Sequence, residues 1–152
     1  MTKTFQAKFF LAALISASIA LLIAGVLFAI TMRTEINEEI AARLVAQARL
    51  AADLLSHTPL SVSELDAEAD RLGALTGTRV TLIAPDGQVV GDSSETPEGV
   101  AAMDNHAQRP EVVAARASGL GRARRHSDTL GIDMLYVAVP VQHPPLGFVR
   151  EQ

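Results

Sequence analysis

The feature that most constrains this chain is an apolar run from Phe9 to Met32, which holds no charged residue over 24 positions. An α-helix rises about 1.5 Å per residue, so the run would extend roughly 36 Å and could cross a hydrocarbon core of about 30 Å. Its few hydroxyl side chains, such as Ser16 and Thr31, can bond back to carbonyls of their own helix. A buried core helix of this length would show a polar face, and this run has none. The sequence therefore predicts a transmembrane helix over residues 9–32.

A cleaved signal peptide is the alternative interpretation of the same run. Lys3 and Lys8 form a basic leader, and the small residues around Ala20 have the spacing of a cleavage site. Cleavage there would leave ten strongly apolar residues at the start of the mature chain. An uncleaved signal anchor is therefore the better prediction.

The basic residues that flank the run favour one orientation. The tail before it carries Lys3 and Lys8 without any acid, whereas the other flank mixes arginines with glutamates. Short, unopposed basic segments stay in the cytoplasm. We expect residues 1–8 to be a cytoplasmic tail and residues 33–152 to be an extracytoplasmic domain, with the chain crossing a cell inner membrane once.

Composition limits what the remaining residues can do. The chain has 152 residues, a net charge of −4 and no cysteine. About 120 residues after the apolar run suffice for one domain. The acidic balance gives no indication of nucleic-acid binding, and the lack of cysteine excludes disulfides and thiolate metal sites.

The residues after the apolar run, Thr34 to His57, contain neither Gly nor Pro and predict a helix that continues the membrane span. Apolar residues recur along it at alternating spacings of three and four: Ala41, Leu44, Ala48, Ala51 and Leu55. This spacing suits a two-helix seam, and equally one helix packing on its own domain. The two interpretations are compatible, because a helix can use one stripe for its domain and another for a partner, and we expect a homodimer through this juxtamembrane helix.

Local signals place a second helix and a hairpin next. Ser61 and Glu64 form a capping-box pattern for a helix over residues 62–76, which Gly77 would end. Residues 79–93 alternate around Pro85-Asp86-Gly87, and that tripeptide suits a tight turn.

The later part of the chain predicts more helix and more strand. Residues 94–99 form a polar loop, residues 100–106 one helical turn or more, and Pro110 opens a helix that ends at Gly119 or Gly121. The expected strands cover residues 122–129, 134–141 and 146–150, with a turn at 130–133. This order of helices and antiparallel strands predicts an α+β domain.

Three runs in this domain carry a resemblance to a known family. They are GDSSE at 91–95, MDNHAQRPEV at 103–112 and RHSDTLGIDMLYVAVPV at 125–141. Together they resemble the extracytoplasmic sensor region of PhoR-type phosphate-regulon sensor histidine kinases. The resemblance covers roughly residues 1–150. It implies a PAS-like, single-Cache-like fold, control by a membrane transporter complex, and no cofactor in this region, since ATP would bind only to the kinase domain.

In that family a second membrane helix, linker domains and a kinase core follow the sensor, and none follows here. We therefore expect the chain to be the C-terminally truncated input portion of such a kinase. The alternative is a single-pass, membrane-anchored protein that binds a ligand or partner without any kinase. An input module of a chemoreceptor or cyclase is a third, more distant interpretation.

The resemblance also selects candidate site residues. Asn105, His106 and Arg109 match the second run and are the candidates for ligand binding or a signal interface, with loop bracing as the plainer alternative. Arg125 matches the third run, and we expect it to brace the fold by pairing with an acid such as Asp92.

Other chemistry is weaker in this sequence. Six residues are of types that bind metals: Asp92, Asp104, His106, His126, Asp128 and Asp133. Nothing in their spacing fixes a third or fourth ligand, so we predict no metal site. Arg122, Arg124 and His126 would share one strand face, which suits either an anion site or a solvated surface.

Catalytic motifs are not found. His57 superficially resembles a kinase phosphoacceptor, but Pro59 ends the helix two residues later, so a helix-end histidine is the better interpretation. No Gly-rich phosphate loop and no G-x-S-x-G elbow occurs in the sequence. We assign no catalytic residue to this chain.

Overall fold

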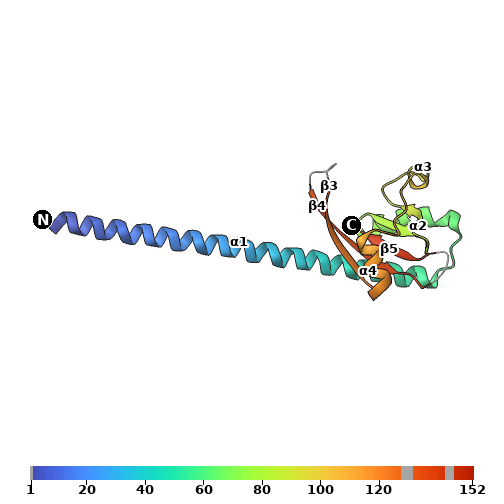
Figure 1. The fold of residues 1–152 in the computed structure, drawn as a ribbon, viewed down its shortest axis with the longest axis horizontal. Helices are drawn as coiled ribbons and strands as arrows, with labels where there is room; N and C mark the ends of the chain where they lie inside the picture. Colours follow the sequence, from blue (N-terminus) through green and yellow to red (C-terminus); the bar gives the residue numbers. More distant parts are fainter. Residues whose placement is uncertain (1, 128–131, 143–145) are drawn as a thin grey trace. The chain divides into compact units, whose positions relative to one another are not determined.

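The computed structural model describes residues 2–127, 132–142 and 146–152. Its elements are α1 (Thr2–His57), η1 (Val62–Glu64), α2 (Leu65–Thr76), β1 (Val80–Ile83), β2 (Val89–Asp92), α3 (Pro97–Ala101), α4 (Pro110–Ser118), β3 (Gly121–Ser127), β4 (Ile132–Pro140) and β5 (Phe148–Glu151) (Figure 1). The chain divides into two compact units, Met1–Ile40 and Ala41–Gln152.

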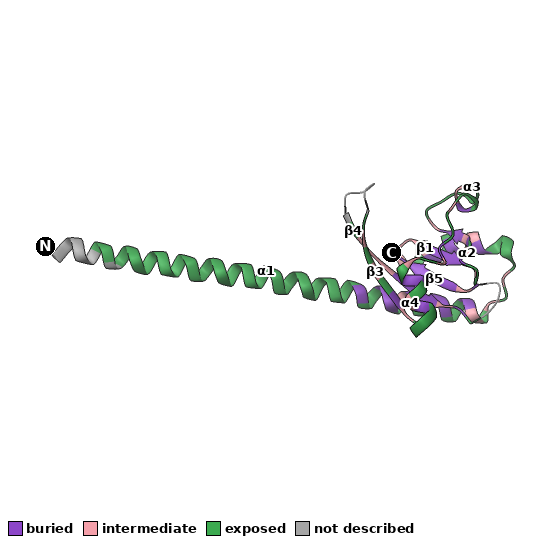
Figure 2. Cartoon of the chain, viewed as in Figure 1, coloured by how far each residue is buried: buried purple, intermediate pink, exposed green. Residues whose placement is uncertain are grey.

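The first unit is the N-terminal part of α1. Its most apolar 18-residue window has a mean hydropathy of 2.6, and none of that window is buried (Figure 2). The hydroxyls of Ser16, Ser18 and Thr31 each bond a carbonyl one turn back, at 2.9–3.0 Å. By length and composition the helix is able to span a membrane. A helix in the core of a soluble protein would instead have its apolar surface covered.

The second unit contains one five-stranded sheet, in the order β2-β1-β5-β4-β3, in which every neighbouring pair is antiparallel. The last strand, β5, lies in the middle of the sheet between β1 and β4, and all four of its residues are buried. With helices on both faces of the sheet, the predicted α+β class is confirmed.

Helices α1 and α2 cover one face of the sheet. All five residues of the predicted seam are at most 7% exposed: Ala41, Leu44, Ala48, Ala51 and Leu55. Four of them, all but Ala41, belong to a core cluster that includes sheet residues such as Leu82 and Val149. The spacing of the stripe is therefore that of a helix packing on its own domain. Because these residues are buried in the core, they are not free to form a dimer seam.

Helix α4 covers part of the other face. Val112 and Ala115 pack there against Ile83 and Phe148. The backbone of β3 comes so close that a Cβ at Gly121 would overlap the carbonyl oxygen of Glu111. Only glycine allows this approach.

Most local predictions are confirmed. The backbone N–H of Ser61 donates to Glu64 Oε2 at 2.8 Å, and the helix that follows ends at Gly77, with φ +70°. The 85–87 turn joins β1 to β2, with Gly87 at φ +93°.

The structure differs from expectation in the following segment. A helix, α3, begins at Pro97 inside the predicted loop, because Thr96 Oγ1 caps it by accepting from Gly99 N at 3.2 Å. Strand β4 begins at Ile132, within the predicted 130–133 turn. Residues 128–131, which include half of that turn, lie outside the described part of the chain.

Candidate functional site: an arginine pocket

A cavity of about 480 Å³ opens on the sheet face that α4 covers in part. Side chains alternate between faces along a strand, so residues 134, 136 and 138 of β4 share this face, as do 148 and 150 of β5. We call the cavity the arginine pocket, because four of its lining residues are arginines: Arg79, Arg109, Arg125 and Arg150.

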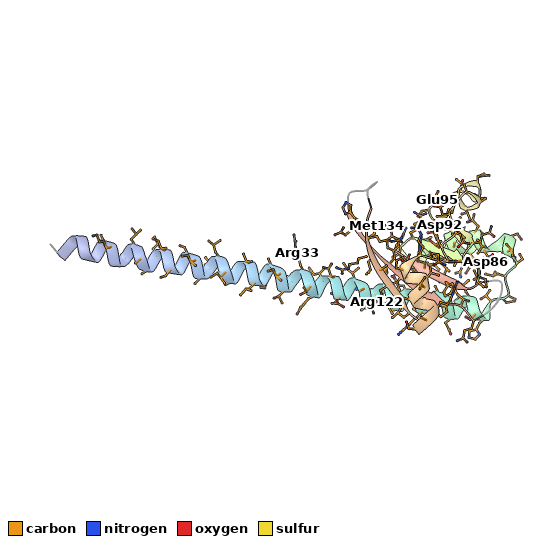
Figure 3. All side chains as sticks on the ribbon, in the orientation of Figure 1. Arg33, Asp86, Asp92, Glu95, Arg122 and Met134 are labelled. Atoms are coloured by element: carbon orange, nitrogen blue, oxygen red, sulfur yellow. The ribbon has the colours of Figure 1, made fainter. Side chains whose placement is uncertain are left out.

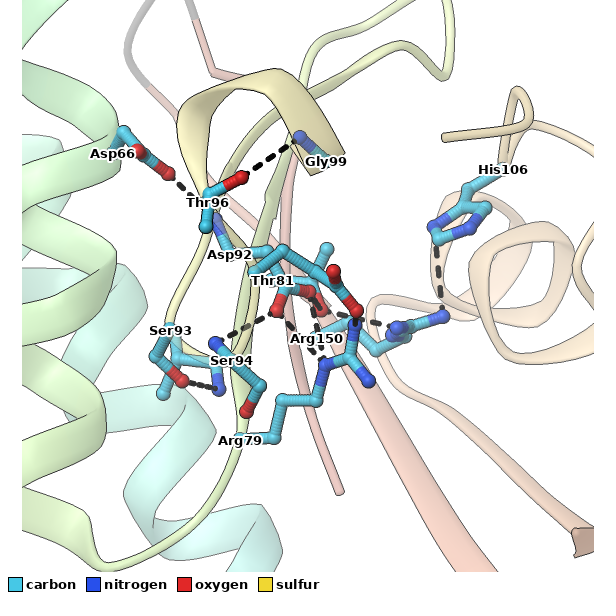
Figure 4. A network of polar contacts seen from close by, with 12 residues as sticks. Asp66, Arg79, Thr81, Asp92, Ser93, Ser94, Thr96, Gly99, His106 and Arg150 are labelled. Carbon is cyan, nitrogen blue, oxygen red and sulfur yellow. Dashed lines mark hydrogen bonds and ion pairs between the residues drawn. The ribbon is translucent and has the colours of Figure 1, made fainter. Parts of the chain in front are cut away.

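A buried polar network forms one wall of the pocket (Figure 4). Asp92, fully buried at the end of β2, accepts from Arg79 Nε at 2.8 Å and from the Thr81 hydroxyl at 2.7 Å. The Thr81 oxygen in turn accepts from Arg150 Nη2 at 3.0 Å. Glu95, labelled with Asp92 in Figure 3, accepts from Arg79 Nη2 at 3.1 Å. A buried carboxylate is stable here because charged donors surround it.

Glu111 of α4 anchors the opposite wall. It is fully buried, and its Oε1 accepts from Arg125 Nη2 at 2.9 Å and lies 3.7 Å from Arg150 Nη1. The expected pairing of Arg125 with an acid is therefore confirmed, but the acid is Glu111 and not Asp92. The reason is topological: Asp92 lies on β2 and Arg125 on β3, at opposite edges of the sheet, with three strands between them.

Arg150 is itself unusual, since it is 4% exposed in the central strand. Burial lowers the pKa of its guanidinium to about 10, while Glu111 and Asp92 work in the opposite direction. It stays charged at neutral pH.

His106 closes the site from the loop between α3 and α4, and it is 3% exposed. Its backbone N–H donates to the Gly87 carbonyl at 2.8 Å. Burial, and then the nearby charges of Arg150, Arg109 and Arg125, lower the pKa of its imidazole to about 4. Its Nδ1 lies 3.5 Å from Arg150 Nη1, and because a guanidinium only donates, this contact favours the neutral tautomer with hydrogen on Nε2.

Tyr136 of β4 lies between two of these cations. Its ring centroid is 3.9 Å from the Arg125 guanidinium carbon and 5.3 Å from that of Arg150. Such contacts attract the guanidinium to the face of the ring and hold its plane in one orientation.

Of the four predicted site residues, three line the pocket: His106, Arg109 and Arg125. The fourth, Asn105, instead braces the loop, because its Nδ2 donates to the Asp86 carbonyl and its Oδ1 accepts from Ala107 N at 2.8 Å. A role of these residues in ligand binding stays a prediction.

Sequence reasoning missed the other seven lining residues, among them Arg79, Tyr136 and Arg150. The sequence signal for Arg150 is its position directly after the apolar residues Phe148 and Val149 of the same strand. A cation in a buried strand must be paired or functional.

The other candidates are distributed over the molecule. Asp92 is paired with Arg79, while His126 and Asp133 form an exposed pair at 2.8 Å on the β3–β4 hairpin. Asp128 lies outside the described residues, and among the described ones no group of three or more possible ligands could hold a metal. Arg122 and Arg124 are exposed. His57 is the last residue of α1 and is exposed, as a helix-end histidine would be.

No protein-family model matches this sequence, and no curated protein matches it. Among solved structures, the crystal structure of the V. cholerae histidine kinase DctB sensor domain is similar, with 18% sequence identity and a TM-score of 0.49. The match covers 59% of this chain and 36% of that one. No residue role follows from so distant a likeness.

Proposed function

We propose that this chain is the membrane-anchored input region of a sensory protein, and that the arginine pocket receives its signal. One observation carries the proposal. A single helix, α1, contains both the apolar span and the stripe that is buried in the core of the pocket-bearing domain. A change in how that stripe packs is therefore a change in the helix that would cross the membrane.

The proposed mechanism is mechanical. A ligand shifts a conformational equilibrium only by its difference in affinity between two states. Three of the five stripe residues are alanines, Ala41, Ala48 and Ala51, which interlock little with the sheet. Small translations or rotations of α1 on this surface need little repacking, and shifts of about 1–2 Å are a common signalling step at helix interfaces.

We further propose that the parent protein is a two-component sensor histidine kinase of the PhoR type in the inner membrane, with this domain extracytoplasmic. Support comes from the three sequence runs at 91–95, 103–112 and 125–141. A membrane transporter or regulatory protein as partner, and ATP in the kinase core, belong to the same proposal. The alternative is a single-pass anchored binding protein without kinase.

A homodimer is also proposed, but through another face of α1. Because the predicted seam is buried, the contact must use residues that remain exposed. Leu50 and Leu54, one turn apart, are 71% and 42% exposed. They are the apolar side chains on this part of α1 that a second copy would cover.

The test joins residues 1–152 to the second membrane helix and kinase core of a two-component protein from which the sensor domain has been removed, so that the kinase lies in the cytoplasm. Ala48→Leu overfills the buried stripe, since Ala48 is 0% exposed, whereas Ala46→Leu adds the same atoms at an exposed position of the same helix. We expect Ala48→Leu to change autophosphorylation several-fold and Ala46→Leu to leave it unchanged. Equal activity in both variants, with the domain still folded by hydrogen exchange, contradicts transmission through α1 and favours the alternative.

The orientation is tested separately. Alkaline phosphatase is active only outside the cytoplasm, so a fusion after Gln152 should be active. A fluorescent protein that folds only in the cytoplasm, fused after Gln152, should fluoresce only if the domain lies in the cytoplasm.

A further inference from the structure

The charges of the arginine pocket do not balance. Arg79 is neutralised by Asp92 and Glu95, and Arg125 and Arg150 share Glu111. Arg109 has no hydrogen bond or ion pair from its side chain to any described residue. Four guanidinium groups therefore meet three carboxylates, and His106 adds no charge because it is neutral. The pocket keeps about one positive charge that the described residues do not compensate.

Hydrogen-bond donors are in excess as well. The Nε atoms of Arg125 and Arg150 are buried and find no acceptor among the described residues, whereas one acceptor of the same cluster, Glu111 Oε2, is buried without a donor. Arg150 is more than nine-tenths buried and lines the cavity. Arginine donates and never accepts, so the missing partner must supply acceptor oxygens and negative charge. An oxyanion does both.

The cavity is larger than an inorganic ion needs. Its volume of about 480 Å³ lies within the range of roughly 300–1,000 Å³ that small-molecule sites occupy. Met103 and Met134 add apolar, adaptable side chains to the wall, and Tyr136 adds an aromatic ring. An occupant with a carbon skeleton would cover these surfaces.

We infer that the arginine pocket binds a small organic molecule with one oxyanionic group, a carboxylate or a phosphate, which pairs with Arg109. The carbon skeleton of the molecule lies against Met103 and Met134. The inference deepens the proposed sensory function and rests on it, since it names the chemical class of the signal.

Calorimetry on the full chain in nanodiscs of zwitterionic lipid tests it with two matched pairs of probes. Benzoate is compared with acetate, and phenyl phosphate with inorganic phosphate, while benzamide serves as the uncharged control. We expect saturable binding of at least one aromatic anion, at least tenfold tighter than its small counterpart, and none of benzamide. Whether benzoate or phenyl phosphate binds more tightly tells whether the oxyanion is a carboxylate or a phosphate.

Variants assign the binding to the pocket. Arg109→Ala should lower the affinity for the aromatic anion tenfold or more, and Arg109→Lys should restore part of that affinity. Arg122→Ala removes an exposed arginine that does not line the pocket, and it should bind as the wild type does. Because the Arg109 side chain makes no hydrogen bond or ion pair with any described residue, its loss should leave hydrogen exchange of the domain unchanged.

Three results would overturn the inference: no saturable heat with any anion, equal binding of phenyl phosphate and inorganic phosphate without binding of benzoate, or full binding to Arg109→Ala. These outcomes are separable from failure of the sensory function. Binding that depends on Arg109 but leaves the kinase fusion unaffected would refute the sensory function and leave the ligand class standing. If the kinase fusion responds to Ala48→Leu while no anion binds, the ligand class is refuted and the sensory function stands.

Discussion

Arg125 of β3 and Glu111 of α4 are joined by an ion pair of 2.9 Å, from Nη2 to Oε1. The pair ties the helix to an edge strand at one wall of the arginine pocket. Glu111 is fully buried, whereas the Arg125 side chain is 27% exposed. The two partners therefore have unequal importance for stability.

Glu111→Gln removes the only carboxylate that both Arg125 and Arg150 contact among the described residues. Two buried or half-buried cations then lose their shared counter-charge, and a loss of about 3 kcal/mol in unfolding free energy is expected. Urea unfolding of the full chain in nanodiscs, followed by pulse proteolysis, measures it. Arg125→Ala should cost less, because Arg150 still faces Glu111. An Arg125→Ala loss equal to or larger than that of Glu111→Gln would contradict this order.

Protonation of His106 should destabilise the fold in acid. The pKa of its imidazole is about 4 in the folded protein against 6.5 ordinarily, so the unfolded chain binds more protons between these values. Stability is thus complete above pH 6.5 and falls by up to about 3 kcal/mol as the pH drops to 4. His106→Gln should flatten this part of the stability profile. Nuclear magnetic resonance titration should show one imidazole that is still neutral at pH 5; titration of every histidine near pH 6.5 would refute the expectation.

Glu151 should have the opposite pH dependence. It is fully buried between Val80 and Val137, and neither carboxylate oxygen has a hydrogen-bond partner among the described residues. Burial raises the pKa of this carboxyl from 4.5 to about 7. The folded state then binds the extra proton, so stability present below pH 4.5 is lost as the pH rises to 7.

Glu151→Gln should therefore stabilise the chain by up to about 3 kcal/mol at pH 8 and change it little at pH 4.5. Urea unfolding of wild type and Glu151→Gln at the two pH values measures the difference. An equal change in unfolding free energy at both would show that the pKa of Glu151 is the same in the folded and the unfolded chain.

Gly87→Ala should disturb the pocket as well as the turn. Gly87 has φ +93°, and a Cβ there would come within 2.5 Å of Ala107, next to the His106 bond to the Gly87 carbonyl. Gly77→Ala is the matched control, with φ +70° and nothing within 4 Å of the new Cβ. Backbone strain should lower the unfolding free energy of both variants by roughly 1 kcal/mol, and the overlap with Ala107 should lower that of Gly87→Ala further. Hydrogen exchange around residues 103–109 should rise only in Gly87→Ala; a rise in both variants would contradict displacement of the loop.

The proposed homodimer face is open to cysteine cross-linking, because the chain has no cysteine of its own. Leu50→Cys should form a disulfide-linked dimer on mild oxidation in the membrane. Ala48→Cys, buried in the core, should not. Cross-linking through position 48 rather than 50 would mean that the stripe leaves its own domain to pair with a second copy.

Local features of the fold could be predicted from the sequence alone. Glu64 bonding to the Ser61 backbone, Gly77 ending α2 and the tight turn at Gly87 were all predictable, because each depends on neighbours within a few positions. The seam at Ala41 to Leu55 was ambiguous, since its spacing serves a second copy or the chain's own sheet equally well. Burial in the core resolved it.

The apolar span, the α+β order and most helix ends follow from the sequence alone, because helix length, periodicity and backbone chemistry are local properties of the chain. The start of α3 is the exception. Only the tertiary structure decided that β5, the last strand, lies in the middle of the sheet. That placement buries Arg150 beside Glu111 and brings Arg79 and Arg109 to the same cavity. Strand order and ion pairing depend on contacts between residues far apart in sequence, and no local pattern encodes which cation will meet which acid.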